Sequence, residues 1–275
     1  MTDGYFSDDS MLRIVQRERA LALSGPRALL MQAAHPLAVK GLIAHSTAID
    51  EPYDRLARTA ETMSTIGFGS REDADAVTAG VRAMHTRVKG RTAERLAGYP
   101  AGTAYRADQP DLLMWVLFTL VDSGTVVYRK YVRSMSSAQE AAYWEDHKVV
   151  GELFGLRRAD MPDTLADLHD YRREMLDGDA LEVTDWARSK ARDIVLDPPV
   201  PWVARPLLES VNFVTIALLP DRIRREYRFS SIPPAPLRKL IVAGGAEYVK
   251  RAVVPFLPDR LRLVPAARAA AAPAA

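Results

Sequence analysis

The sequence predicts a single all-α domain in which helices form a bundle-like shell. Apolar residues recur at helical spacing along most of the 275 residues, and no segment shows the alternation typical of strands. Proline, glycine and capping residues divide this pattern into helices of ordinary length. We expect the domain to span residues 10–262, with flexible termini at residues 1–9 and 263–275.

The first third of the chain predicts four helices, over residues 10–24, 26–46, 51–66 and 71–89. Pro36 lies inside the second of these, so we expect a bend or break just after His35, because proline lacks the amide donor that a helix interior needs. The fourth helix has acidic residues in its first turn and Lys89-Gly90 at its end, which suits the helix dipole and a glycine cap.

The rest of the chain predicts one central helix and several peripheral ones. Residues 99–110 are rich in Gly, Pro and Asp and predict a loop. Residues 111–131 form the most apolar segment, and a helix that is apolar on so many sides belongs at the centre of a bundle. Further helices are expected to begin near Ser137, Asp163 and Thr184, which are suitable N-cap residues.

The composition excludes several classes of chemistry. The chain has no cysteine, which excludes thiolate-ligated haem, iron–sulfur clusters and a cysteine nucleophile, and fits a cytoplasmic location. No histidine has a glutamate three residues before it, as di-iron carboxylate bundles require, and no dinucleotide or phosphate-binding loop occurs. Basic residues are dispersed among acids, so we expect no nucleic-acid binding. Metal chemistry must then rest on carboxylates, tyrosines or the five histidines: His35, His45, His85, His147 and His169.

Charge is distributed unevenly along the chain. Residues 221–275 contain 11 Arg or Lys residues and four acids, a net charge of +7 within a chain whose total is +2. The acidic N-terminus is unlike a secretory signal, and no apolar run reaches the ~18 residues of a membrane span. The basic region predicts either peripheral contact with anionic lipid or a solvated helical surface.

His85 is the candidate metal ligand. It lies at the margin of an apolar stripe formed by Val77, Val81, Met84 and Val88, so its imidazole is expected to face the interior or a cleft. A neutral imidazole in such a place can ligate haem iron, although a hydrogen-bonded core histidine gives the same pattern.

The preceding helix carries a second candidate group. Arg55, Thr59 and Thr62 share one side of it, with Arg58 adjacent. A guanidinium can hold a haem propionate or bound dioxygen, and a hydroxyl can donate to the distal oxygen. A solvated face paired with nearby acids fits the spacing equally well.

The remaining histidines have weaker patterns. His35 ends a very apolar helix and His45 lies near an expected helix end, and a structural role accounts for either position taken alone. His147 and His169 lie among charged neighbours, which predicts that both are surface residues.

Several of these segments together resemble the catalytic domain shared by latex-clearing rubber oxygenases and mpaB-type oxygenases. The similar pieces run from about residue 10 to about residue 230 and, in order, are Arg27-Ala-Leu-Leu-Met-Gln-Ala-Ala-His-Pro, Ala44-His-Ser, Arg55-Leu-Ala-Arg-Thr59, Met84-His-Thr-Arg-Val-Lys-Gly90, Tyr105-Arg-Ala-Asp108, Leu112-Leu-Met-Trp-Val and Asp122-Ser123. The resemblance implies an all-α fold enclosing haem b, with a histidine rather than a thiolate bound to iron.

The resemblance also implies roles for individual residues. His85 is the expected axial ligand, and Arg55, Arg58 and Thr59 are expected to border the distal side. Cofactor contacts are expected from His85, Arg27 and Arg55. The region of His35 and His45 is where rubber-cleaving enzymes supply an acid or base. Two departures stand out: Leu117 replaces a histidine that many relatives carry, and the distal glutamate has no clear counterpart.

The sequence therefore predicts a haem-dependent oxygenase that uses dioxygen and an apolar, isoprenoid-like or secondary-metabolite substrate. In this hypothesis the substrate lies against Trp115 and Phe118, and the reaction is cleavage of a carbon–carbon double bond or hydroxylation. The alternatives are a non-catalytic haem-binding sensor, carrier or partner protein, and a membrane-surface helical protein whose only support is the basic region.

Overall fold

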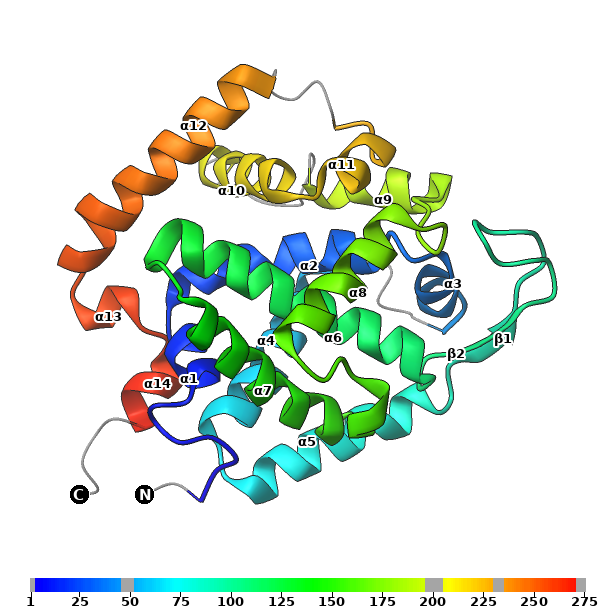
Figure 1. Ribbon diagram of the computed structural model, residues 1–275, viewed down its shortest axis with the longest axis horizontal. Coiled ribbons are helices and arrows are strands. Elements are labelled where there is room, and N and C mark those ends of the chain that lie inside the picture. The colour runs from blue at the N-terminus through cyan, green and yellow to red at the C-terminus, as the bar shows by residue number, and fades with distance from the viewer. Residues whose placement is uncertain (1–2, 46–51, 196–204, 230–234, 271–275) are drawn as a thin grey trace.

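The computed structural model describes residues 3–45, 52–195, 205–229 and 235–270. This part of the chain contains fourteen α-helices, three short 3₁₀ turns, two π-helical turns and one two-stranded sheet, which confirms the predicted all-α class (Figure 1). The N-terminal helices are α1 (Met11–Gln16), α2 (Ser24–Gln32), α3 (Pro36–His45), α4 (Pro52–Phe68) and α5 (Arg71–His85), with a 3₁₀ turn at Arg19–Leu23. The central and C-terminal helices are α6 (Pro110–Val127), α7 (Ser137–Leu153), α8 (Leu165–Asp177), α9 (Asp185–Val195), α10 (Arg205–Leu218), α11 (Asp221–Glu226), α12 (Ala235–Tyr248), α13 (Asp259–Arg262) and α14 (Pro265–Ala270).

The break predicted at Pro36 is present. Helix α2 ends at Gln32, and α3 begins at Pro36 itself. The amide of His35 donates to the Gln32 carbonyl (3.1 Å) and that of Val39 to the His35 carbonyl (3.1 Å), so the chain turns without leaving either group unpaired. The bend places His35 between two helices rather than within one.

A small hairpin replaces the last turn of the helix expected over 71–89 and part of the loop expected over 99–110. Strand β1 (Lys89–Arg91) pairs antiparallel with β2 (Ala104–Arg106), and Gly90 faces Tyr105. A Cβ at Gly90 would lie 2.5 Å from the Tyr105 hydroxyl oxygen, so glycine lets the tyrosine cross the strand. Three-residue strands are too short to give an alternating pattern, which is why the sequence did not reveal them.

Helix α6 is the centre of the molecule, as its composition predicted (Figure 1). It contacts α2 along much of its length and also α7, and most of its side chains are buried. Among the described residues, Pro110–Val132 is the one helical segment long and apolar enough to cross a membrane, and 72% of its apolar window is buried in protein. That burial is typical of a core helix.

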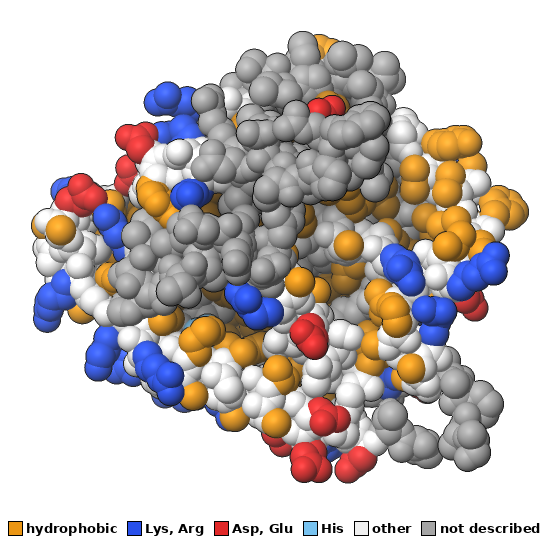
Figure 2. Space-filling view, turned by 180° about the vertical axis from the view of Figure 1, so that it is seen from behind, with side chains coloured by type: hydrophobic (Ala, Val, Ile, Leu, Met, Phe, Trp, Pro, Cys, Tyr) orange, Lys and Arg blue, Asp and Glu red, His pale blue; other side chains and the backbone are white. Residues whose placement is uncertain are grey.

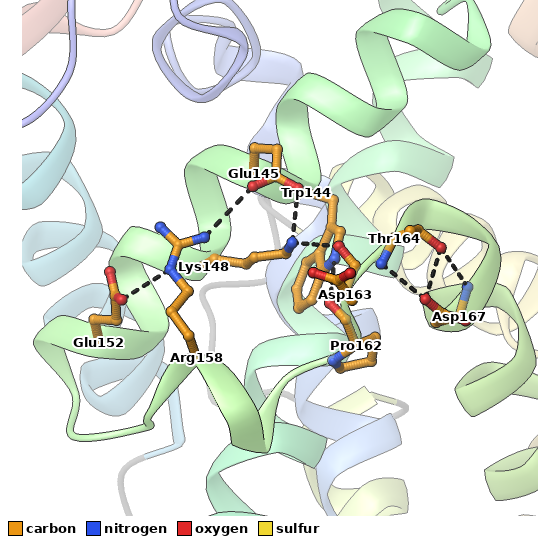
Figure 3. Close-up of polar contacts among 9 residues, drawn as sticks. All are labelled: Trp144, Glu145, Lys148, Glu152, Arg158, Pro162, Asp163, Thr164 and Asp167. Atoms are coloured by element: carbon orange, nitrogen blue, oxygen red, sulfur yellow. Dashed lines mark hydrogen bonds and ion pairs between the residues drawn. The ribbon is translucent and has the colours of Figure 1, made fainter.

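Helices α7 and α8 are joined by a network of polar contacts (Figure 3). Lys148 is only 4% exposed; its ammonium group donates to Glu145 (2.7 Å) and to the Asp163 carbonyl, and lies over the Trp144 ring. The Trp144 indole donates to the Pro162 carbonyl (3.0 Å), and Thr164 caps α8. These side chains stabilise the turn between the helices.

The described parts of both expected flexible termini contact the domain. Near the N-terminus, Phe6 is buried and the Arg71 amide donates to the Asp3 carbonyl (2.8 Å). Near the C-terminus, Val264 donates to the Arg17 carbonyl (2.8 Å), and Ala267 of α14 is buried. Folded structure therefore extends beyond residues 10 and 262 at both ends.

Candidate functional site

Helix α5 presents its C-terminal end as the candidate site. Ser70 caps the helix by accepting from the Asp73 amide (3.1 Å), and acids occupy the first turn. Its fully buried residues are Ala74 and Thr78. The predicted stripe is wrong at Met84, which is 53% exposed. The inward face is set instead by the line from Ala74 through Thr78, which reaches His85 two turns later.

His85 itself is half-buried, at the last residue of α5. The hairpin covers this end of the helix: the Ala107 amide donates to the Val88 carbonyl (2.9 Å), directly after the turn that follows His85. The imidazole is thus on an inward-facing line of the helix, and it is half-buried with its Nδ1 atom shielded from solvent. This agrees with the predicted position at the margin of a buried face.

Asp108 is the carboxylate that the hairpin brings toward His85. The Arg106 guanidinium donates to both of its oxygens (2.9 and 2.7 Å). The hydrogen bond and charge of Arg106 hold the pKa of Asp108 below its usual value, and the positive form of His85 adds a smaller effect in the same direction. The sequence contained Asp108 within a family-like segment but gave no reason to pair it with His85.

The distal candidates on α4 are only partly described. Arg58 and Thr59 are exposed, and Thr62 is half-buried. The backbones of Arg55 and His45 belong to α4 and α3, while their side chains lie outside the described part of the structure. Whether these residues face His85 stays a prediction.

His35 is placed in the interior at the bend between α2 and α3. It is 2% exposed, its Nε2 atom is 3.2 Å from the Tyr99 hydroxyl oxygen, and its ring lies near Trp115. Burial lowers the pKa of His35 to about 4, so the imidazole is neutral at pH 7. Tyr99 lies in a loop without a motif, so no sequence signal predicted this pair.

Arg27 makes its hydrogen bonds within the fold. Its guanidinium is 1% exposed and donates to the Leu218 carbonyl (2.8 Å), the Ser123 hydroxyl (2.7 Å) and the Asp122 carboxylate (2.7 Å). Asp122 also pairs with Arg172 at 3.2 Å. All three guanidinium nitrogens therefore donate hydrogen bonds that join α2 with α6 and α10, and the cofactor contact stays a prediction.

The expected substrate surface is likewise filled by protein. Trp115 is 0% and Phe118 2% exposed, and the two rings stack with centroids 5.6 Å apart. Phe118 also meets Tyr171 of α8 edge-on. These side chains form the core rather than a substrate surface. Leu117 is buried as well, and a Cβ at Gly151 of α7 would lie 3.0 Å from it, so the departure from the family pattern falls within core packing.

The two remaining histidines differ from each other. The prediction for His147 is wrong: it is 1% exposed, and its Nδ1 atom donates to the Tyr143 carbonyl (2.8 Å). Burial lowers the pKa of His147 to about 4. Charged neighbours in sequence misled the prediction because they occupy other faces of α7 or, like Lys148, are buried by pairing. His169 is exposed, as predicted, and lies 3.5 Å from Glu140.

The donor set fits a cofactor that needs one protein ligand better than a bare metal ion. Across the described ranges, no group of three or more histidine or carboxylate side chains could hold a metal. An open surface hollow of about 800 Å³ is lined by residues of α8 and α11 and of the segment after α8, Asp179 and Arg225 among them, and does not include His85. Among the described side chains, the half-buried imidazole of His85 could supply the one protein ligand that a haem iron needs, because a porphyrin supplies four others.

These features define a cysteine-free helical protein in which, among the histidine side chains that the structure describes, His85 is half-buried on an inward-facing line of its helix. Within that class, the chain belongs to the family described as ER-bound oxygenase mpaB/B'/rubber oxygenase, catalytic domain, whose family model matches residues 12–253. The match confirms the resemblance and the class of oxygenase catalytic domains. Comparisons with curated proteins and with solved structures found no match.

Proposed function

We propose that the chain is a haem b-dependent oxygenase in which His85 is the axial ligand of the iron. One observation supports this most directly: in a domain of an oxygenase family, His85 continues the inward face of α5 yet remains only half-buried. Two other histidines, His35 and His147, are fully buried, and contacts within the core hold both of them.

The protein surroundings of His85 suit iron ligation. A metal-bound imidazole needs a fixed ring orientation and a nearby negative charge, which increases its basicity. The hairpin that packs after α5 gives rigidity, and Asp108 gives charge while Arg106 keeps the carboxylate fixed. Haem bound there would supply the activation of dioxygen for oxidation of an apolar alkene or hydrocarbon.

Other residues of the chain would prepare the distal side. The candidate hydrogen-bond donors to a haem propionate or to dioxygen are Arg55, Arg58 and Thr59. His45, near the end of α3, is a candidate acid or base, and so is His35. His35 is neutral at pH 7 and accepts a hydrogen bond more readily than it gives up a proton.

The absorption spectrum of the purified full chain tests the proposal. After reconstitution with haem, a Soret band is expected in the wild type and is expected to be lost in His85→Ala. His169→Ala is the matched control because His169 is exposed and distant in sequence. His147→Ala is a poor control because removing a buried imidazole would destabilise the core.

Three outcomes separate the possibilities. The proposal is supported if the Soret band is lost in His85→Ala but not in His169→Ala, and if the wild type consumes oxygen in the presence of an isoprenoid alkene. A normal band in a folded His85→Ala protein contradicts the ligand assignment. A haem-loaded wild type that consumes no oxygen with a range of apolar alkenes and hydrocarbons would favour a sensor or carrier.

A further inference from the structure

Large apolar side chains are exposed along one stretch near the C-terminus. The stretch, residues 248–262, is called the C-terminal arm here. It contains Tyr248 (67% exposed), Phe256 (80%) and Leu261 (56%), and Met84 of α5 is the one other large hydrophobic residue found strongly exposed in the described part of the chain. Figure 2 shows hydrophobic side chains gathered at the edge of the molecule near α12, with Lys and Arg side chains beside them. Large apolar side chains exposed within so short a stretch of chain are typical of an interaction surface.

The C-terminal arm is held in place by buried contacts. Arg262 donates to both oxygens of Glu18 (2.8 and 2.6 Å), and the Glu18 side chain is 2% exposed. The Arg19 guanidinium donates to the Leu263 carbonyl (2.9 Å), and Val254 is buried. The three apolar side chains are therefore presented by folded backbone and do not belong to a fraying end.

The charges of this region divide into two groups. Arg222 and Arg224, like Arg262, donate to backbone carbonyls or carboxylates within the fold, so they contribute little to an outer basic surface. Arg251 and Arg260 are exposed within the C-terminal arm. Arg251 is 80% exposed and pairs with Glu247 at 2.7 Å, and an ion pair so exposed contributes little and exchanges readily.

We propose that the C-terminal arm docks the protein on an anionic lipid surface. Phe256, Leu261 and Tyr248 would enter the interfacial region of the bilayer, and Arg251 and Arg260 would lie at the level of the lipid phosphates. Aromatic and aliphatic side chains beside arginines are the combination that binds such an interface.

A lipid surface suits these residues better than a protein partner. The C-terminal arm projects single apolar side chains that alternate with cations, whereas the core of a protein interface is depleted in charge. A fluid bilayer needs no complementary shape and accommodates separate side chains at different depths. The two exposed cations of the arm, Arg251 and Arg260, favour anionic lipid. This inference does not depend on haem binding.

Sedimentation of the full chain with vesicles provides the test. We expect the protein to bind vesicles of phosphatidylcholine with phosphatidylglycerol, and to bind pure phosphatidylcholine much less. The double variant Phe256→Ser/Leu261→Ser is expected to weaken binding on the order of tenfold, because it removes two large apolar side chains from the interface. Met84→Ser is the control, since it removes an apolar side chain about as exposed as Leu261 (53% against 56%) from another element, α5.

The charge component has its own test. Arg251→Gln/Arg260→Gln is expected to weaken binding to anionic vesicles several-fold, and Arg173→Gln, an exposed arginine of α8, is expected to have no effect. Raising the salt concentration from ~0.1 to ~1 M should also weaken binding. Thermal unfolding verifies that all variants are folded.

Two results would overturn the inference. One is absence of binding to anionic vesicles, or binding that the arm substitutions leave unchanged in folded protein. The other is a dimer in solution that Phe256→Ser/Leu261→Ser dissociates while the wild type ignores vesicles, which would assign the arm to a second copy of the chain.

Discussion

His35 and His85 lie in two different environments within one helical domain. His35, at the bend between α2 and α3, is 2% exposed and held by Tyr99, and burial keeps it neutral. His85, at the end of α5, is half-buried beside a hairpin that carries a fixed carboxylate. The comparison teaches that two histidines at helix ends can differ greatly in depth of burial, which helical spacing alone does not reveal. The deeply buried His35 is held by contacts of the core, whereas the half-buried His85 is the residue that we propose as the iron ligand.

The largest stability effect is expected at the buried ion pair between Arg27 of α2 and Asp122 of α6. Asp122→Ala removes the carboxylate that pairs with Arg27, a guanidinium that is 1% exposed. The expected loss of unfolding free energy is about 3–5 kcal/mol, because a buried charge is left without its partner. Denaturant unfolding measures it. Arg172→Ala removes the 40% exposed partner of the same carboxylate and should cost about 1 kcal/mol or less. Equal effects of the two variants would contradict a structural role for the buried pair.

Lowering the pH should reduce the free energy of unfolding through the two buried histidines, His35 and His147. The pKa of both His35 and His147 is lowered by burial from 6.5 to about 4. The unfolded chain therefore binds more protons than the folded chain below pH ~6.5, and stability that is fully present at pH 7 is lost as the pH falls toward 4. Between pH 7 and pH 5 we expect a loss of about 2 kcal/mol for each histidine.

Chemical denaturation at the two pH values, in wild type and in His147→Asn, measures this effect. The variant should show a smaller dependence on pH than the wild type, and His169→Ala should leave the dependence unchanged because that residue is exposed. Unfolding free energies that do not differ between pH 7 and pH 5 would contradict burial of both imidazoles in the neutral form.

The contact between His35 and Tyr99 should have a smaller effect. Tyr99→Phe removes the hydroxyl that lies 3.2 Å from Nε2 of His35 and retains the ring. The expected loss of unfolding free energy is about 1 kcal/mol, the typical net contribution of one hydrogen bond. The NMR titration of His35 would be the second measurement. A variant as stable as the wild type with an unchanged titration would show that the contact is not formed in solution.

The smallest stability effect is expected at His85, and this would distinguish His85 from the buried His35. His85→Gln should change the unfolding free energy of the haem-free protein by about 1 kcal/mol or less, because the side chain is only half-buried. Haem binding, measured by the Soret band, should nevertheless be lost. A large loss of stability without loss of haem would place His85 with the structural histidines instead.

Much of the fold could be predicted from local pattern. The break at Pro36, the central position of α6 and the acidic first turn of α5 follow from proline geometry, apolar composition and helix-dipole electrostatics, which act over a few residues. The hairpin could not be predicted because its strands have three residues and depend on Tyr105 crossing Gly90.

The candidate site was predictable to a smaller degree. Helical spacing identified His85 as inward-facing, although it assigned Met84 to the wrong face. Charged sequence neighbours suggested that His147 lies on the surface, but a helix carries such neighbours on separate faces. The cofactor contact of Arg27 was expected from the family resemblance, which does not show that Asp122, 95 positions away, accepts a hydrogen bond from its guanidinium.

By itself the sequence determined the helical class, the absence of cysteine chemistry, the family and the basic character of the C-terminal region, since these depend on composition, periodicity and ordered motifs. Only the tertiary structure decided which polar residues hydrogen-bond within the core, that the imidazole of His85 is half-buried, and which arginines and aromatic side chains face outward. The physical reason is that burial and partner choice are set by contacts between residues far apart in the chain, and no local pattern encodes such contacts.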